Sequence, residues 1–208
     1  MKDSSIEETG DARPGAETLQ TVQIWDPLLR LFKWSLTISV AAAWGLGMFG
    51  PDIMTLHFWF GYAVLGLLAF RLVWGLWGPE HARFKSFAYG PVAILKYVFG
   101  MFRRKPSYWP GHNPLGGLFV FVLLAVLLLQ AVSGLFVDPD DYINVGPLAK
   151  YVGSETTRAA LSFHVQLGWV VLGLVGLHVA AILFYSKWKG ENLVTPMITG
   201  RKKVRKKP

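Results

Sequence analysis

Residues 160–185 read ALSFHVQLGWVVLGLVGLHVAAILFY, a stretch with no charged side chain and two histidines. About 18 or more mostly apolar residues in a row are what a helix needs to cross a bilayer. Three further stretches meet this description, Leu28 to Phe49, Met54 to Trp77 and Leu115 to Val137. Together with Ala160 to Tyr185 they predict an all-α integral membrane protein, a four-helix bundle.

The composition supports a membrane protein. Of the 208 residues, 52% are hydrophobic and only 16% are charged, whereas soluble domains carry roughly 25% charged residues. The apolar residues occur in long blocks, and the charges lie between them. The chain has no cysteine, which excludes disulfides, thiolate metal sites and any cofactor attached through a cysteine.

The ends and the central loop are polar. Residues 1–22 lack the basic start and apolar core of a signal peptide, so we expect them to be retained and mostly disordered. Residues 81–112, between the second and third spans, are too polar to cross a membrane. Within them, 90–102 (GPVAILKYVFGMF) predicts a helix lying in the membrane interface. The membrane domain is expected over 23–190 and a basic tail over 191–208.

Basic residues mark the cytoplasmic side of a membrane protein. They gather in the loop between spans two and three and in the tail, whereas the opposite side is acidic, so both termini are predicted to be cytoplasmic. The tail and the net charge of +8 are expected to serve orientation and contact with anionic membrane lipid rather than nucleic acid. The basic residues are Arg83, Lys85, Lys96, Arg103, Arg104, Lys105, Lys187, Lys189 and 201–207; the acidic side holds Asp52, Asp138, Asp140, Asp141 and Glu155, with Lys150.

Ionisable residues inside the spans are costly and are functional by default. His178 follows His164 by 14 residues, and Arg71 follows His57 by the same interval. At about 100° per residue, 14 steps return to within about 40° of the same helix face, ~21 Å further along. Each of these two spans therefore carries one polar group near each membrane surface, on one face.

Spans two and four run in the same direction, so His57 and His164 are expected at one depth near the outer surface. Two imidazoles facing each other from different helices are the ligands that a six-coordinate haem iron needs. A glycine follows each histidine by one turn, Gly61 and Gly168, and leaves room for the flat porphyrin. The spacing therefore predicts an outer haem b, with Arg71 and His178 level with an inner site.

Simpler interpretations exist for each residue. A membrane histidine can form a hydrogen bond across the bundle, and glycines often serve helix packing. Arg71 could extend to the inner interface without a partner. The matched spacing and the matched glycines favour haem over these alternatives.

Several short motifs occur along the chain in a recognisable order. They are Trp25-Asp26-Pro27, His57 with Gly61-Tyr62, Phe70-Arg71, Trp74-Gly75, His81-Ala82-Arg83-Phe84, Gly111-His112-Asn113-Pro114, His164 with His178, Glu191-Asn192-Leu193-Val194 and Met197-Ile198-Thr199-Gly200. Together they resemble the bacterial cytochrome b561 family, which includes the b-type cytochrome subunits of nickel–iron hydrogenases. The resemblance covers about residues 23–203 and implies a four-helix bundle with two b haems in the bacterial inner membrane. It further implies electron transfer between quinone and a redox partner, either cytochrome c or an oxidoreductase subunit.

The first span departs from the family pattern Arg-x-Phe-His-Trp, because it reads Arg30-Leu31-Phe32-Lys33-Trp34. The resemblance makes the absent histidine the inner partner of His178, and makes Arg30 and Arg71 partners of haem propionates. Lys33 can ligate iron as a neutral amine, or stay charged and pair with a propionate or a lipid phosphate. Otherwise His178 holds the inner haem alone, His112 replaces Lys33, or no inner haem binds.

The resulting hypothesis is an electron carrier without catalytic side chains, whose iron ligands are His57, His164, His178 and, provisionally, Lys33. Quinone-reactive activity would come only through the family. One alternative is a haem-poor membrane anchor of an oxidoreductase complex, and a weaker one is a haem-free proton or ion pathway. His81 and His112 are expected to be solvated or interfacial. Gly47, 14 residues after Lys33, is expected to give the outer haem clearance.

Overall fold

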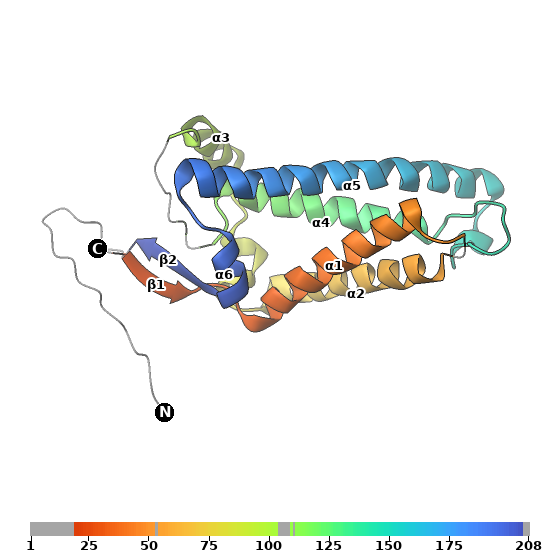
Figure 1. Ribbon diagram of the computed structural model, residues 1–208, viewed down its shortest axis with the longest axis horizontal. Helices are drawn as coiled ribbons and strands as arrows, with labels where there is room; N and C mark the ends of the chain where they lie inside the picture. The colour runs from red at the N-terminus through yellow and green to blue at the C-terminus, as the bar shows by residue number, and fades with distance from the viewer. Residues whose placement is uncertain (1–18, 53, 104–108, 110, 206–208) are drawn as a thin grey trace, which may run out of the picture.

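The computed structural model describes residues 19–52, 54–103, 109 and 111–205. Four long helices follow the long axis of the molecule (Figure 1), within a few residues of the predicted spans except at the ends of the last, which is longer. They are α1 (Pro27–Phe49), α2 (Thr55–Trp77), α4 (Pro114–Gly134) and α5 (Ser154–Lys189). The first and last described residues lie at one end, called the strand end; the α1–α2 and α4–α5 connections lie at the other, called the loop end (Figure 1).

Local sequence signals set the helix ends. Pro27 and Pro114 are the first residues of α1 and α4, where proline's missing N–H costs nothing. The preceding residues cap these helices: Asp26 Oδ1 accepts from Leu29 N at 3.0 Å, and Asn113 Oδ1 accepts from Gly116 N at 2.7 Å. Helix α5 ends at Gly190, whose φ of 64° lies in the left-handed region that favours glycine.

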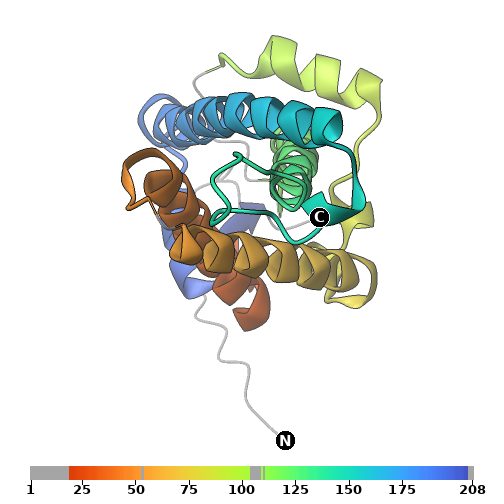
Figure 2. The same ribbon diagram turned by 90° about the vertical axis from the view of Figure 1, so that its right-hand side faces the viewer.

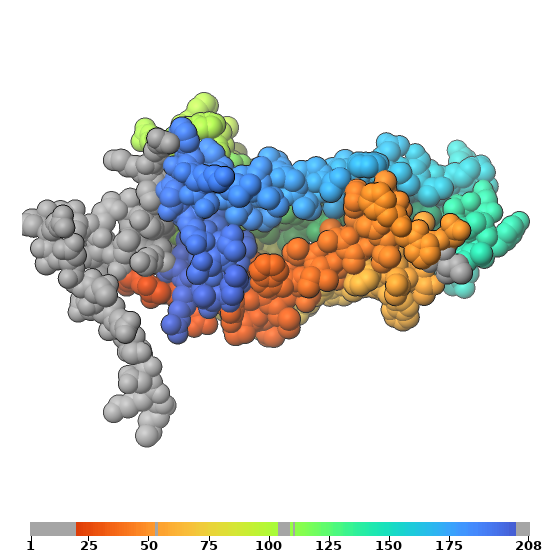
Figure 3. Space-filling model, viewed as in Figure 1, coloured from red at the N-terminus to blue at the C-terminus, as the bar shows by residue number. Residues whose placement is uncertain are grey.

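The bundle consists of two helical hairpins. Helix α1 packs against α2, α4 against α5, and α2 against α4, and the end-on view shows the two hairpins facing each other (Figure 2). Helices α1 and α5 pack less closely than these three pairs. The space-filling view shows a recess between them, with α4 visible behind (Figure 3). A buried cluster joins α2, α4 and α5; its members are Val64, Leu68, Leu127 and Val171.

Three helices in the described part of the chain, α2, α4 and α5, are long and apolar enough to cross a membrane. Helix α1 has a comparable length of 23 residues, but Arg30, Lys33 and several hydroxyl side chains lower its hydropathy. Large apolar side chains such as Leu31, Trp59 and Trp77 remain more than half exposed on the outside of the bundle. An apolar exterior of this kind is typical of a lipid-facing surface.

The described chain is mostly helical, as predicted, but it also contains two short strands that were not predicted. Strand β1 (Leu19–Gln23) pairs antiparallel with β2 (Arg201–Arg205), so residues 19–22 form a strand instead of belonging to a disordered segment. The pairing depends on Gly200, whose φ of 81° turns the chain after α6 (Val194–Thr199). Its carbonyl accepts from the backbone N–H of Ile24 at 2.9 Å and of Trp25 at 3.1 Å.

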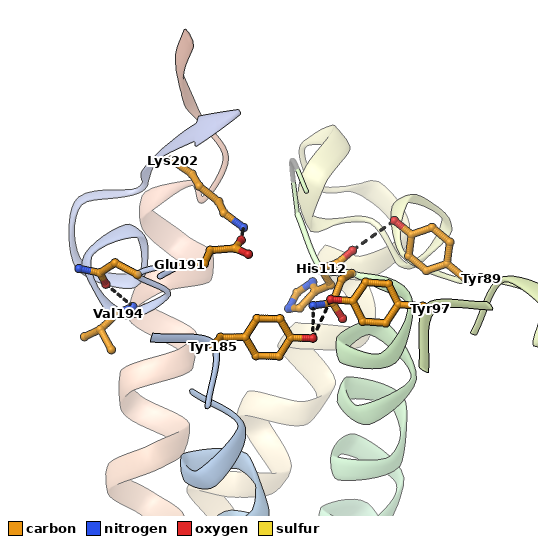
Figure 4. A network of polar contacts seen from close by, with 9 residues as sticks. Tyr89, Tyr97, His112, Tyr185, Glu191, Val194 and Lys202 are labelled. Atoms are coloured by element: carbon orange, nitrogen blue, oxygen red, sulfur yellow. Dashed lines mark hydrogen bonds and ion pairs between the residues drawn. The ribbon is translucent and has the colours of Figure 1, made fainter. Parts of the chain in front are cut away.

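The tail is therefore folded back onto the strand end. Lys202 and Glu191, both nearly inaccessible, form an ion pair at 2.9 Å (Figure 4). The parts of the sequence predictions that fall on residues 1–18, Arg104, Lys105 and 206–208 lie outside the described residues.

The loop between α2 and α4 contains two short 3-10 turns, η1 (Glu80–Ala82) and η2 (Phe84–Ser86), and helix α3 (Pro91–Gly100). A short helix was predicted here, and its place in the membrane interface stays a prediction. Tyr97 of α3 contacts the Tyr185 hydroxyl at 2.7 Å, and Asn113 Nδ2 donates to the same oxygen at 3.1 Å (Figure 4). The α4–α5 loop includes a third turn, η3 (Ala149–Tyr151).

Candidate functional site

Two histidine side chains meet at the loop end. His57 is in the first turn of α2 and His164 is on α5; their ring centroids are 6.0 Å apart and the ring planes are inclined by 79°. Two metal–nitrogen bonds of about 2 Å, placed end to end between two imidazoles, also separate the ring centroids by about 6 Å. The structure thus brings together the two residues that the sequence paired, at a separation that suits a shared metal.

The surroundings of His57 decide which ring nitrogen carries its proton. Nδ1 lies 2.8 Å from the backbone carbonyl oxygen of Ala43. A carbonyl oxygen can only accept a hydrogen bond, so Nδ1 is the donor and carries the hydrogen. The lone pair of Nε2 is therefore available to a metal.

His164 has the same tautomer for a similar reason. Its Nδ1 lies 2.9 Å from the carbonyl oxygen of Gln130 and 3.1 Å from Ser133 Oγ. The Ser133 hydroxyl donates its only hydrogen to the Gln130 carbonyl at 2.9 Å, so both neighbours of Nδ1 are acceptors. The Gln130 amide, with Nε2 at 3.2 Å, donates to His164 Nε2. Backbone acceptors of this kind fix the orientation of metal-binding histidines.

Two cavities adjoin the imidazoles. The larger has a volume of about 210 Å³ and the smaller about 70 Å³, and both are lined by His57, His164 and Gly61. A Cβ atom added to Gly61 would meet nothing within 4 Å, and one added to Gly168, which lines the smaller cavity, would meet only Gln130 Nε2 at 3.6 Å. Both predicted glycines therefore leave space beside the rings.

The donor set favours haem iron over a free metal ion. Among the described residues, no group of three or more His, Cys, Asp or Glu side chains could hold a metal ion. Haem iron requires only two axial ligands from the protein, because the porphyrin occupies its other positions. Two imidazoles whose Nδ1 atoms donate to acceptors fit this requirement, because each keeps a lone pair on Nε2. At His164 that lone pair accepts from the Gln130 amide, which a bound haem would displace.

A second group of polar residues lies toward the strand end. Lys33 Nζ lies 3.6 Å from the centre of the Trp25 ring, is buried, and has no hydrogen-bond partner among the described residues. Arg71 is only 3% exposed, and its guanidinium carbon lies 4.5 Å from the centre of the Phe84 ring. The Arg71 side chain is therefore enclosed by the protein.

His112 was expected to be solvated or interfacial, and the structure contradicts the first of these. Its ring lies between those of Trp25 and Phe87, with centroids 4.9 Å from each, and its backbone carbonyl accepts a hydrogen bond from Tyr89 (Figure 4). Burial, followed by the positive charges of Lys33 and Arg71, holds the pKa of His112 well below its ordinary value. The loop folds back against the bundle and takes this histidine inside. His81, on η1, is partly exposed.

His178, the other predicted inner ligand, stacks on Phe119 with parallel rings 5.7 Å apart. Arg30 donates a hydrogen bond to the carbonyl of Ile198, but its Nε has no partner among the described residues. Buried polar groups usually have partners. At the strand end, four buried nitrogens lack one in the described part of the chain: Arg30 Nε, Lys33 Nζ, Arg71 Nη1 and His112 Nδ1.

Comparison with known proteins identifies the family of the chain. The family model of prokaryotic cytochrome b561 matches residues 24–200. The chain belongs to this family. Its members are b-type cytochromes, so this b561-family protein is a membrane cytochrome of electron transport, and b-type haem is the cofactor that the family implies.

The protein is also similar to a probable Ni/Fe-hydrogenase B-type cytochrome subunit from Azotobacter vinelandii. The two are 27% identical over 157 residues, which cover 61% of this chain. The match spans 63% of the relative's own length.

Sequence reasoning missed the residues that orient the two histidines. The acceptors for Nδ1 are backbone carbonyls, which no residue type specifies. Ser133 and Gly134, near the end of α4, lie against the His164 ring. The only sequence signal for this contact was a Gln-x-x-Ser-Gly pattern over residues 130–134. Gly47, expected to give the porphyrin clearance, lies against the His57 ring: an added Cβ would be 3.1 Å from His57 Cε1.

Proposed function

We propose that this protein is a four-span cytochrome that carries electrons between the quinone pool and a redox partner through haem b held by His57 and His164. One observation carries the proposal: the two imidazoles face each other at 6.0 Å with both Nδ1 atoms bonded to backbone acceptors. In this tautomer both Nε2 atoms can ligate iron.

The chain's own residues hold and insulate the cofactor. The carbonyls of Ala43 and Gln130 fix the ring orientations, and Gly61 and Gly168 leave space beside the rings. The iron supplies the one-electron chemistry when haem is bound. Apolar residues such as Val64 and Val171 line the smaller cavity and limit water access, which together with ligand identity sets the reduction potential.

A second haem near the strand end is the finer part of the proposal. His178 and Lys33 are its candidate axial ligands, and Arg30 and Arg71 are the candidate partners of its propionates. The unpartnered Arg30 Nε and Arg71 Nη1 support this, because guanidinium groups bind carboxylates strongly. A lysine–histidine pair differs from two histidines in ligand field, so we expect the inner haem to differ spectroscopically from the outer one.

The proposed membrane arrangement counts α1 as the fourth span. The strand end is cytoplasmic, with both termini inside, and α3 lies in the interface of the bacterial inner membrane. The distribution of basic residues supports this orientation. The loop end, with Asp138, Asp140 and Asp141, then faces outward and offers an acidic surface to a basic redox partner. The similarity to a probable hydrogenase cytochrome subunit supports an oxidoreductase as partner.

A second candidate function is a membrane anchor that holds an oxidoreductase with little or no haem. The observation in its favour is Lys33, which stands where the family pattern has an iron ligand. An incomplete inner site would interrupt electron flow across the membrane.

The haem content of the purified protein tests the proposal. His57→Ala and His164→Ala should each lose one low-spin haem b, measured as the ratio of pyridine haemochrome to protein. His81→Ala serves as the control, because His81 lies in the loop between α2 and α4, outside the pair. If both variants keep the wild-type ratio and spectrum, the assignment of the site is wrong. A wild-type ratio near zero would support the anchor.

A further inference from the structure

We propose that Gly47 and Gly134 are positioning residues that set the ring planes of the two haem ligands. The inference rests on the proposed function of His57 and His164. It gives Gly47 a different role from the haem clearance that its spacing from Lys33 suggested, and it assigns a role to Gly134, which the sequence did not single out.

Each hairpin contains a backbone carbonyl that binds a histidine ring and, four residues later, a glycine that lies against the same ring. On α1, the carbonyl of Ala43 binds the imidazole, and Gly47 follows four residues later. On α4, the carbonyl of Gln130 binds the other imidazole, and Gly134 again follows four residues later. Residues four apart lie one turn apart on one helix face. The carbonyl thus anchors Nδ1, and the glycine one turn on faces the same ring.

The space at each glycine is filled by the imidazole. A Cβ at position 47 would lie 3.1 Å from His57 Cε1 and 3.2 Å from its Nδ1, and no other atom is within 4 Å. At position 134, the three nearest atoms all belong to His164, with Cε1 at 2.9 Å. Gly117 is different, because its Cβ would meet the backbone of Phe87. Helix packing therefore does not explain Gly47 and Gly134.

These distances predict unequal effects of a methyl group. Carbon atoms in ordinary contact are about 3.5–4.0 Å apart, so alanine at either position must displace the ring. The hydrogen bonds of Nδ1, at 2.8 Å in His57 and 2.9 Å in His164, oppose a translation of the ring and favour a tilt. The clearance is smaller at Gly134, so His164 should tilt more.

Contacts outside the iron's ligands set the orientation of each axial ring. The low-spin signal of the iron depends on that orientation, so a tilt of one ring changes the signal. A purely structural glycine would affect folding yield and leave the signal of the folded protein unchanged. The spectrum therefore distinguishes positioning from packing.

The experiment compares Gly134→Ala, Gly47→Ala and Gly45→Ala in the full-length purified protein. All three exchanges give the same gain in helix propensity. Gly45 is the matched control, because it is on α1 and an added Cβ would meet nothing within 4 Å. Electron paramagnetic resonance measures the low-spin g values, and gel filtration with circular dichroism checks folding.

We expect the outer-haem g values to shift most in Gly134→Ala, less in Gly47→Ala and not in Gly45→Ala. Unchanged g values in the first two, or an equal shift in the control, would overturn the inference. If Gly134→Ala does not fold, Gly47→Ala decides the matter alone. A wild-type protein without low-spin haem would refute the proposed function, which is a separate result.

Discussion

Asn144 joins the two loops at the loop end, and its replacement should loosen the cover of the haem site. Only 8% exposed, it accepts a hydrogen bond from Met54 N at 2.8 Å and donates to the Asp52 carbonyl at 2.7 Å. It also donates to Asp141 Oδ2 at 2.6 Å. Asn144→Ala removes all three bonds, and with them the link between the α1–α2 and α4–α5 connections.

The expected loss follows from these contacts. Each hydrogen bond is worth about 1 kcal/mol net, and a buried N–H left without a partner adds a further penalty of about 1–3 kcal/mol. Because water can reach part of the loop, we expect Asn144→Ala to lower the free energy of unfolding by about 3 kcal/mol. For a chain of this size, this corresponds to a fall of about 6–12 °C in the melting temperature.

Thermal denaturation in detergent, followed by the haem absorption band and by circular dichroism, measures this loss. Met54, Asp141 and Asn144 line the larger cavity, so the variant should release haem before its helices melt. Asn192→Ala is the control, because Asn192 is exposed at the strand end and its side chain accepts from Val194 N and Thr195 N, each at 3.0 Å. Equal losses of stability and equal haem release in the two variants would refute the reasoning.

Two further predictions concern orientation and the inner site. A membrane-impermeant label should reach a cysteine placed at Asp140 from outside intact spheroplasts, and one placed after Gly200 only after lysis; the reverse pattern would exchange the inner and outer haem positions. Lys33→His should give two similar low-spin haems, whereas Lys33→Met should alter only one spectral component. A single haem in both the wild type and Lys33→His would contradict an inner haem and favour the anchor.

The sequence predicted the long helices because apolar blocks and flanking prolines are local signals. It missed the small β-sheet because the pairing of β1 with β2 joins opposite ends of the chain. Neither strand has an apolar pattern of its own. The turn at Gly200 and its backbone bonds to Ile24 and Trp25 appear only once the bundle brings the chain ends together.

The candidate site was predictable only in its side chains. The shared direction of the second and fourth spans predicts His57 and His164 at one depth, but the acceptors for their Nδ1 atoms are backbone carbonyls, which every residue possesses. His112 was misjudged for a related reason. Its loop is polar in sequence, yet the ring is enclosed by Trp25, which precedes α1, and by Phe87, from an earlier part of the same loop.

Lys33 bears most directly on the choice between electron carrier and anchor. Its ammonium is buried over the Trp25 ring, a contact worth at most about 2 kcal/mol, whereas an unpaired buried charge costs several times that. Asp26 attracts Lys33 through its charge, but its two oxygens accept hydrogen bonds from Leu29 N and Trp74 Nε1. Among the described residues, neither Lys33 Nζ nor Arg71 Nη1 has a hydrogen-bond acceptor. A haem would supply acceptors through its propionates and a metal through its iron. An anchor without haem leaves the cost of burying Lys33 and Arg71 unexplained.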